Sequence, residues 1–252
     1  MCRKTIIAFV LLFCFFSISA LLTPSVGQAD STVAEVTAEP DEYAEYDEEV
    51  GDLYDPWEPM NRSIFTFNDR LHLWIIEPTS SGYEKVTPSI LRSGLRNFFN
   101  NLLEPTRIIN CLLQGRFQDA EETFLRFALN TTAGVGGIMD PGTYEELKSH
   151  KGQFFQTFAK YGVSSGPFLV LPFFGPSDIR GTVGLVGDAV VSPLFFALYD
   201  KPEVALAVQS VYTINQTSFK LGEYEKLLSG ALDPYVAVRD AYVQNQQEML
   251  EK

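Results

Sequence analysis

The stretch "PSILRSGLRNFFNNLLEPTRIINCLLQGRFQDAEETFLRFALNTTAGVGGIMD", residues 88–140, decides the fold class of this chain. Its apolar side chains recur every three or four residues, as on one face of an α-helix. We expect a helix from Pro88 that Glu104-Pro105 bends or restarts, and that Gly115 ends as a C-cap. A second helix follows from Phe117 until the glycine-rich end of the stretch breaks it.

Helical spacing also appears on both sides of this stretch. In "DPWEPMNRSIFTFNDRLHLWIIEP", residues 55–78, one stripe holds Met60, Ile64, Phe67 and Leu71. Pro59 suits the first helical turn, and Pro78 marks the expected stop. Residues 202–252 look helical as well. The predicted class is therefore mainly α, with amphipathic helices that lie in a membrane interface or pack on one another. Periodicity alone favours packing.

The segment between these helical regions is less regular. Residues 140–160 are polar and are expected to form a loop, while residues 161–199 hold two apolar stretches, around Phe168–Phe174 and Leu185–Tyr199. The first stretch is too short to span a membrane, and the second contains Asp188 and Pro193. Neither stretch therefore predicts a conventional transmembrane helix.

The N-terminal residues predict export. Residues 1–29 begin with a positive region and an apolar core and end in small residues, as a secretory signal peptide does. Residues 30–54 belong to an acidic segment that predicts a disordered linker. The segment carries much of the net charge of −13, which argues against nucleic-acid binding. We expect the remaining residues, 55–252, to form one helical domain.

The three cysteines bear on disulfides and lipidation. Cys2 and Cys14 leave with the signal peptide, so Cys111 remains alone and no internal disulfide can form. Phe13 directly precedes Cys14, where a lipoprotein site would have a small residue. We therefore expect an exported chain that is not lipidated.

Two short motifs suggest chemistry that the rest of the sequence does not support. Gly162-Val-Ser164-Ser-Gly166 matches the nucleophile elbow of serine hydrolases, but that fold places its histidine after the serine. Both histidines, His72 and His150, precede Ser164. Pro167 and an extended apolar run also replace the helix that should follow. A turn built from glycine and serine is the favoured interpretation, although other triad orders exist on other folds.

The second motif is the glycine cluster Gly134-Val-Gly136-Gly137. A dinucleotide loop would need a glycine where Met139 stands and a strand before the motif, whereas a helix is expected there. A flexible break after a helix explains the glycines better. The two separated histidines and one mature cysteine give no metal-ligand cluster, so we expect neither a cofactor nor a metal.

Four longer stretches carry a family resemblance. They are "DPWEPMNRSIFTFND" (55–69), the part of the opening stretch from Leu95 to Asp140, "YGVSSGPFLVLPFFGPSDIRGTVGLVGD" (161–188) and "DPYVAVRDAYVQ" (233–244). In this order they resemble the MlaA/VacJ family, and they cover most of residues 55–244. Each stretch is longer and more specific than the short motifs above.

The resemblance implies a fold and a function. It implies a flat, ring-shaped bundle of amphipathic helices, embedded in the periplasmic leaflet of the outer membrane of a Gram-negative bacterium, with a central amphipathic channel. Such proteins remove phospholipids that have strayed into the outer leaflet and pass them to a soluble periplasmic carrier, MlaC. A trimeric porin holds the disc in place. No covalent chemistry is implied, so the resemblance predicts a transport component that is not an enzyme.

The resemblance also nominates residues. A stretch that controls channel opening in the family corresponds to Phe65-Thr-Phe67-Asn68, which we expect to act as a gate or hinge, although simple packing of the two rings remains an alternative. Arg126 is a candidate for meeting a phosphate in the channel, or else a partner of Asp140 or Glu122. Further candidates for channel lining or lipid contact are Gly134, Gly136, Gly137, Phe168, Pro172, Phe173 and Phe174.

Two other functions remain open at this point. One is a secreted lipid hydrolase that uses Ser164. The other is a structural envelope protein required for surface spreading, a phenotype that lipid transport would also produce.

Overall fold

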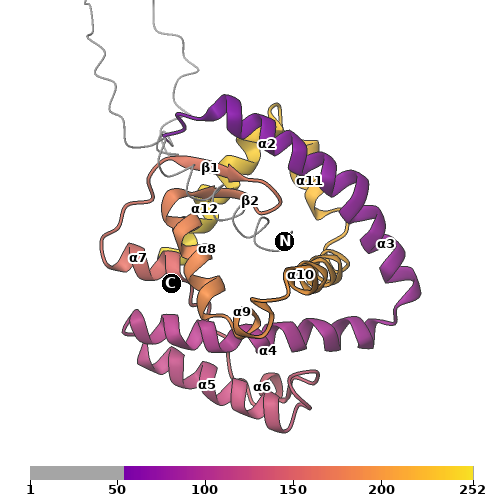
Figure 1. The fold of residues 1–252 in the computed structure, drawn as a ribbon, viewed down its shortest axis with the longest axis vertical. Helices are drawn as coiled ribbons and strands as arrows, with labels where there is room; N and C mark the ends of the chain where they lie inside the picture. The colour runs from indigo at the N-terminus through magenta and orange to yellow at the C-terminus, as the bar shows by residue number, and fades with distance from the viewer. Residues whose placement is uncertain (1–53, 252) are drawn as a thin grey trace, which may run out of the picture. The chain divides into compact units, whose positions relative to one another are not determined.

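The computed structural model describes residues 54–251 (Figure 1). In chain order the elements are α2 (Glu58–Leu71), the π-helix η2 (His72–Ile76), α3 (Glu77–Val86), α4 (Ser89–Leu113), α5 (Phe117–Thr132), α6 (Pro141–Tyr144), α7 (Phe154–Lys160), β1 (Phe168–Leu171), β2 (Gly175–Asp178), α8 (Ile179–Val191), α9 (Pro193–Leu198), α10 (Pro202–Thr217), α11 (Glu223–Ser229) and α12 (Pro234–Glu251). The predicted mainly-α class is confirmed. The predicted signal peptide, and the predicted linker apart from Tyr54, lie outside the described residues.

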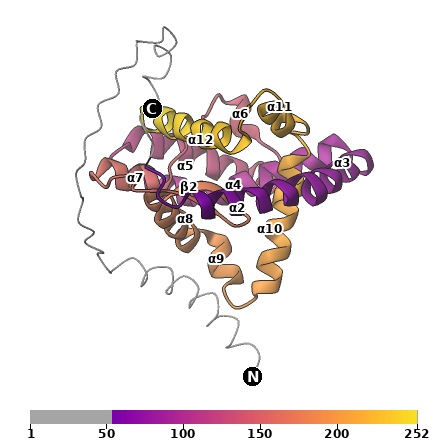
Figure 2. The same ribbon diagram turned by 90° about the horizontal axis from the view of Figure 1, so that it is seen from above.

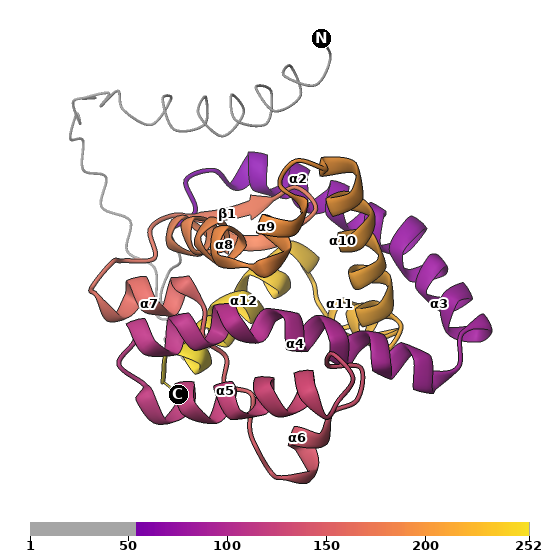
Figure 3. The ribbon, with the colours of Figure 1, turned by 60° about the horizontal axis from the view of Figure 1, so that its bottom comes forward.

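Helices α4 and α5 form the expected hairpin, side by side in Figures 1 and 3. Gly115 ends α4 as predicted, with φ of +68°. Its N–H donates to the Leu112 carbonyl at 2.9 Å, and the Arg116 N–H donates to the Cys111 carbonyl at 2.8 Å, which is a Schellman motif. The predicted restart at Pro105 is wrong, because α4 continues through it. Packing along α5 outweighs the one hydrogen bond that proline removes.

The first helix is longer than the sequence suggested. Pro78 does not stop it, because α2, η2 and α3 follow one another without a break. The Glu77 N–H donates to the His72 carbonyl, five residues back, which is the π-helical pattern. A wider turn at this point gives the Pro78 ring room that a regular α-turn would deny it, so the helix passes the proline.

Residues 140–160 are only partly a loop. Helix α7 occupies Phe154–Lys160, and Gln153 and Gln156 form a capping box at its start. The run of polar residues concealed this short helix. It packs against α8, where a Cβ on Gly184 would come within 2.7 Å of the Phe155 backbone.

The apolar stretch after Pro167 is a β-hairpin. Strands β1 and β2 pair antiparallel, with Phe168 opposite Asp178 and Leu171 opposite Gly175. Residues 172–174 form the connecting turn at the hairpin tip. The extended apolar run expected after Pro167 is confirmed, and the hairpin lies beside α2.

The described residues bury polar side chains more often than apolar ones. Seven apolar residues are buried, against nineteen polar or charged ones. Large apolar residues are exposed on several helices, among them Trp74, Ile90, Phe117, Phe196 and Leu206. The expectation that the apolar stripes would serve mainly as core packing is therefore wrong for much of the chain: Met60 and Phe67 of the predicted stripe are each 46% exposed.

Helices α9 and α10 also carry large exposed apolar side chains. Figure 2 shows these two helices extending to one side of the layer that contains α2 and α4. Phe196 is 66% exposed and Leu206 is 70% exposed there. Among residues 54–251, no helix combines the length and the apolar character that crossing a bilayer requires.

Candidate functional site

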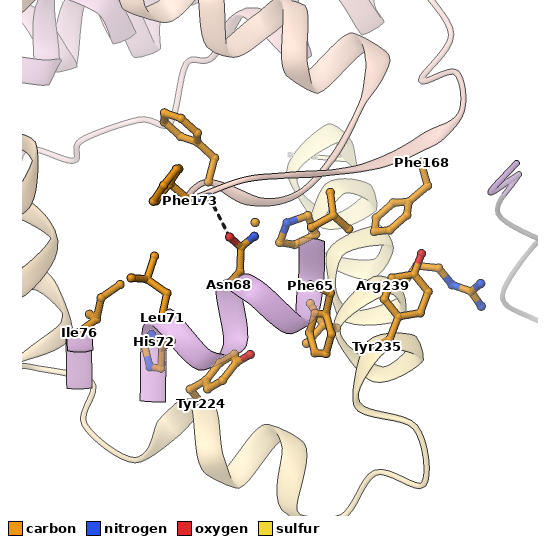
Figure 4. Close-up of a pocket in the computed structure, with 15 residues that line it drawn as sticks. Phe65, Asn68, Leu71, His72, Ile76, Phe168, Phe173, Tyr224, Tyr235 and Arg239 are labelled. Carbon is orange, nitrogen blue, oxygen red and sulfur yellow. Dashed lines mark hydrogen bonds between the residues drawn. The ribbon is translucent and has the colours of Figure 1, made fainter. Parts of the chain in front are cut away.

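Two asparagines fasten the β-hairpin to α2. Asn68 Nδ2 donates to the Leu171 carbonyl at 2.9 Å. The Phe173 N–H donates to Asn68 Oδ1 at 2.8 Å, the bond marked in Figure 4. Asn61 does the same two turns earlier: its Nδ2 donates to the Phe168 carbonyl at 3.2 Å, and the Val170 N–H donates to its Oδ1 at 2.9 Å. Each amide replaces the neighbouring strand that β1 lacks on this side.

The spacing of these asparagines explains the fit. Seven residues of α-helix advance about 10.5 Å, and three residues of strand advance about 10 Å. The bonded groups of β1 and the hairpin tip are offset by three residues, from Phe168 to Leu171 and from Val170 to Phe173. Asn61 is not among the residues predicted from the sequence. The signal was an identical amide at i and i+7 on one helix face.

Aromatic contacts surround these amides. Phe67 meets Phe173 of the hairpin tip edge to face, with ring centroids 5.3 Å apart. Phe65 packs on Tyr235 of α12 at 5.8 Å, and Phe168 packs on the same ring at 6.2 Å. Phe65 is therefore partly buried against the core cluster of Phe168, Val170 and Tyr235, whereas Phe67 is half exposed and touches the tip.

A pocket of about 160 Å³ opens between α2, the hairpin and the C-terminal helices (Figure 4). Its lining is mainly apolar or aromatic, with a few polar groups, which suits an amphipathic ligand. The lining residues are Phe65, Asn68, Leu71, His72, Ile76, Phe168, Val170, Phe173, Phe174, Gly175, Pro176, Tyr224, Tyr235, Val238 and Arg239. The structure thus brings five of the nominated residues to one pocket: Phe65, Asn68, Phe168, Phe173 and Phe174.

The hairpin tip is strained and exposed. Phe173 has φ of +69°, a left-handed conformation that a bulky residue rarely adopts. Phe173 and Phe174 are 71% and 70% exposed, and Pro172 beside them is exposed too. Backbone strain of this kind persists where surrounding contacts impose it, and it concentrates at sites that switch or clamp. Here the imposing contacts are Asn68 and Phe67.

Besides Arg239 and His72, the polar side chains of the pocket are the amide of Asn68 and the phenols of Tyr224 and Tyr235. Burial, and a hydrogen bond to Asp69, raise the pKa of Tyr224. Burial, and a hydrogen bond to Asp55, raise the pKa of Tyr235. Both phenols therefore stay protonated at neutral pH. Asp55 also accepts from Asn61 Nδ2 at 2.7 Å, so one carboxylate links α12 to α2.

Arg126 and the three nominated glycines lie in a different place: Arg126 is on α5, and the glycines are in the turn that follows α5. Arg126 donates from Nη2 to Asp140 and from Nη1 to the Leu147 carbonyl, so one of its two alternative partners is present. Gly137 has φ of +89°, and a Cβ there would come within 2.5 Å of Asn101. Gly134 is equally tight against the Asn130 carbonyl, whereas Gly136 faces open space.

No hydrogen bond within residues 54–251 joins Ser164 to either histidine. It is exposed in the loop before the hairpin. His150 bonds to Glu122 at 2.8 Å, and His72 stacks on Tyr224 with ring centroids 4.4 Å apart. Within residues 54–251, no cluster of three or more histidine, cysteine, aspartate and glutamate side chains is arranged to hold a metal. Cys111 is a buried free thiol.

Comparison with known proteins agrees with this architecture. A solved structure, described as the structural basis for maintenance of bacterial outer membrane lipid asymmetry, superposes with a TM-score of 0.69 at 31% identity. The match covers 78% of this chain and 98% of that one.

Sequence relatives point the same way. The intermembrane phospholipid transport system lipoprotein MlaA of Haemophilus influenzae is 34% identical over 202 residues, which is 79% of this chain and 80% of that protein. Its namesake in Escherichia coli is 32% identical over 194 residues, covering 75% and 76%. An uncharacterized protein of Rickettsia prowazekii, RP093, is 32% identical over 191 residues, covering 75% of each chain.

The family model for the MlaA lipoprotein matches residues 53–249, which is the whole described part of the chain apart from its last residues. This span includes both asparagines, the hairpin and all the nominated site residues. The chain belongs to the MlaA lipoprotein family.

Proposed function

We propose that this chain is a non-enzymatic component of a phospholipid transport system that maintains the lipid asymmetry of the outer membrane. It removes phospholipids misplaced in the outer leaflet and hands them to a periplasmic carrier. Family membership and the names of the relatives support transport and lipid asymmetry in general. The observation that carries the proposal is the inverted burial pattern, with polar side chains inside and large apolar ones outside.

This burial pattern suits a protein embedded in one membrane leaflet. Lipid tails solvate exposed apolar rings, and a polar interior offers a route for a head group. The exposed Phe196 and Leu206 supply the first feature. Asn110 and Asn215 show that the interior is polar, but both are fully buried, so a route for a head group has to open between the helices. We place the protein as a ring of amphipathic helices in the periplasmic leaflet, with the polar interior as its channel.

The pocket beside the hairpin is the proposed gate. A cavity of about 160 Å³ is smaller than a phospholipid, so passage requires the pocket to widen. The hairpin tip is the element best placed to move, because it is exposed, strained at Phe173 and held to α2 by Asn68 and Phe67. Arg126 of α5 and the three glycines of the turn after α5 stay predicted channel contacts.

The partners implied by the family resemblance are also proposals. They are phospholipid as cargo, the carrier MlaC as acceptor and a trimeric porin as anchor. The relatives are named lipoproteins, whereas the residue before Cys14 predicts a chain without lipidation. An apolar rim and the porin then take over membrane retention.

Native mass spectrometry tests the transport proposal directly. The full-length gene product is extracted from its own membrane in mild detergent and kept intact. We expect phospholipid of unchanged mass bound to the protein, and the protein mass also reports signal cleavage and lipidation. A lipid-free protein recovered from the periplasmic fraction without detergent would overturn the proposal.

The gate has its own test. Asn68→Ala releases the hairpin tip, and the matched control Ser63→Ala removes only an exposed hydroxyl bonded within the same helix. We expect Asn68→Ala to change the amount of outer-leaflet phospholipid labelled on intact cells at equal protein level. The control should leave it unchanged. Equal labelling in both variants and wild type would contradict the gate.

A further inference from the structure

A second cavity, of about 220 Å³, lies between α4 and α5 on the hairpin seen in Figure 3. It shares no lining residue with the gate pocket. Its lining consists only of polar and charged residues: Asn97, Asn100, Asn101, Glu104, Arg107, Arg126, Asn130, Asp140, Ser149 and Lys151. A packed helix pair normally joins apolar faces, so a polar cavity here calls for an explanation.

One face of α4 supplies the polar wall. Asn97, Asn100, Asn101 and Glu104 stand at i, i+3, i+4 and i+7, which is the spacing of a single helix face. Asn101 is 7% exposed and Glu104 is 2% exposed. The most buried of the four is therefore a carboxylate, the side chain that least tolerates burial without partners.

Two oxygen atoms in this wall lack partners. Glu104 Oε1 accepts from Arg107 Nη1 at 3.0 Å and from Ser149 Oγ at 2.7 Å, but Oε2 accepts no hydrogen bond from the described residues. Asn101 Oδ1 is unpartnered as well, while its Nδ2 donates to Thr131. Both atoms are acceptors, so the missing partner is a hydrogen-bond donor. Beside a carboxylate, a cationic donor is favoured.

The rest of the lining narrows the choice of cation. Arg107, Arg126 and Lys151 face the same cavity. The wall leaves two oxygens without partners, which is fewer than the set of oxygen ligands that Ca²⁺ or Mg²⁺ requires. Arg107 is bonded to Glu104, and Arg126 to Asp140. Lys151 is exposed and forms no ion pair within the described residues. Glu104 Oε2 and Asn101 Oδ1 are closed to solvent in this structure, so a ligand reaches these acceptors only when the side chains around them shift. On its exposed side the cavity offers Lys151, a cation without an ion pair.

We propose that this cavity binds a primary-amine phosphate head group, the phosphoethanolamine moiety. The ammonium donates to Glu104 Oε2 and Asn101 Oδ1, and the phosphate lies toward Lys151. A quaternary ammonium, as in choline, carries no N–H and leaves both acceptors unpartnered. The inference draws on the proposed lipid transport only for the source of the ligand, because the free head group would bind by the same contacts.

Soluble head groups test the recognition without acyl chains. The full chain in mild detergent is titrated with glycerophosphoethanolamine, glycerophosphocholine and inorganic phosphate. We expect the ethanolamine compound to bind at least about tenfold more tightly than the choline compound, because charge-assisted hydrogen bonds are lost in the latter. Equal binding of the two compounds, tighter binding of phosphate alone, or no binding of the ethanolamine compound would overturn the proposal.

Variants locate the two ends of the ligand. Glu104→Gln keeps the shape but places an amide where the ammonium should meet a carboxylate, and Lys151→Met removes the phosphate partner. Lys148→Met, in the same loop but absent from the cavity lining, is the matched control. We expect weaker binding in the first two variants only. If Glu104→Gln fails to fold, the comparison of Lys151→Met with Lys148→Met still tests the site. Equal affinities of these two variants for glycerophosphoethanolamine would contradict it.

Lipid-bound protein separates this inference from the proposed function. The chain is reconstituted in nanodiscs that contain equal amounts of phosphatidylethanolamine and phosphatidylcholine, and the retained lipid is identified by native mass spectrometry. Retention of both lipids without preference contradicts the amine site and leaves transport standing. Binding of glycerophosphoethanolamine by a chain that retains no lipid supports the amine site, identifies a soluble source for the ligand and counts against transport.

Discussion

Asn61 shows how much one side chain contributes to this fold. It is fully buried and bonds to Asp55, to the Phe168 carbonyl and to the Val170 N–H. Asn68 makes the two analogous bonds at the tip, where it is only half buried. The buried Asn61 amide therefore fixes the start of β1 to α2. The half-buried Asn68 amide holds the hairpin tip by bonds that water can replace.

This difference predicts unequal effects of alanine. Asn61→Ala leaves buried backbone groups of β1 without partners, at a cost of about 2 kcal/mol or more. Asn68→Ala exposes its partners to water, so we expect a loss of about 1 kcal/mol or less. Chemical unfolding in mild detergent measures both. Hydrogen exchange at the Phe173 amide should rise in Asn68→Ala. Equal destabilisation by the two variants would contradict the proposed division of tasks.

Asp188 predicts a dependence of stability on pH. Burial raises its pKa from 3.8 to about 6, while hydrogen bonds from the Phe154 N–H and from Asn110 limit the rise. The unfolded carboxyl titrates lower, so the folded state binds more protons between pH 3.8 and about 6. The contribution of Asp188 to the free energy of unfolding therefore falls as pH rises through that window and is constant above it.

Asp188→Asn tests this directly. The amide keeps an acceptor for the Phe154 N–H but carries no charge. We expect the variant to lose the decline in stability across the window and to be at least as stable as wild type at neutral pH. Unfolding free energies measured across the window check this. An unchanged pH profile would show that Asp188 is solvated in the folded state.

At the scale of elements, some helix ends are set by local backbone preference, whereas others depend on tertiary packing. Gly115 ends α4 because its left-handed backbone closes the Schellman bonds, which is a local property. Neither Pro78 nor Pro105 ends a helix. A π-turn precedes Pro78, and packing along α5 stabilises the helix around Pro105. A glycine cap can therefore be predicted from the sequence more safely than a proline stop.

Two substitutions of glycine by alanine should change the free energy of unfolding in opposite directions. Gly115→Ala forces a Cβ into a left-handed position, although the nearest other atom, Lys160 Nζ, is 3.5 Å away. We expect a loss of about 1 kcal/mol from the backbone alone. Gly82→Ala lies inside α3 with nothing within 4 Å and should stabilise by about 0.5–1 kcal/mol. Thermal unfolding of both variants checks the pair, and a shift of the same sign in both would refute the assignment.

At the scale of the whole described part, the inverted burial pattern decides which environment suits the protein. Polar networks such as Asn110 with Asp188 and Thr157 occupy the interior, and large rings stand outside. Such an arrangement would be costly in water, where exposed apolar area is unfavourable. In a membrane interface, the same arrangement is stable.

Membrane binding should depend on the exposed aromatic side chains of α9, Phe195 and Phe196, which we call the α9 corner. Phe195 and Phe196 are 44% and 66% exposed, so the double change to serine removes apolar area without opening a core. Each ring contributes up to about 1.5–3 kcal/mol when it is fully transferred from water, so we expect clearly weaker binding to liposomes in flotation. Tyr144→Ser, at an 87% exposed ring on α6, is the control. A similar loss in the control would show that the α9 corner has no special role.

Sequence predicted part of the candidate site. Phe65, Asn68, Phe168 and Phe173 were nominated from two segments about a hundred residues apart, and the structure brings them to one pocket. Arg126 and the glycines were nominated with them but lie on α5 and in the turn that follows it. The periodicity of a segment does not indicate which distant segment it will face. The sequence therefore could not show that the nominated residues belong to two different places in the fold.

The sequence by itself determined the helical class, the glycine cap of α4, the non-helical segment before α8 and the family. These follow from local backbone preferences and from long matching stretches, which require no knowledge of distant contacts. Only the tertiary structure decided that Asn61 and Asn68 replace a missing strand, that the polar faces of the helices turn inward, and that Glu104 keeps an unpartnered oxygen in a cavity. The physical reason is that an amphipathic helix has two faces, and its sequence does not say whether water, lipid or another helix meets each of them.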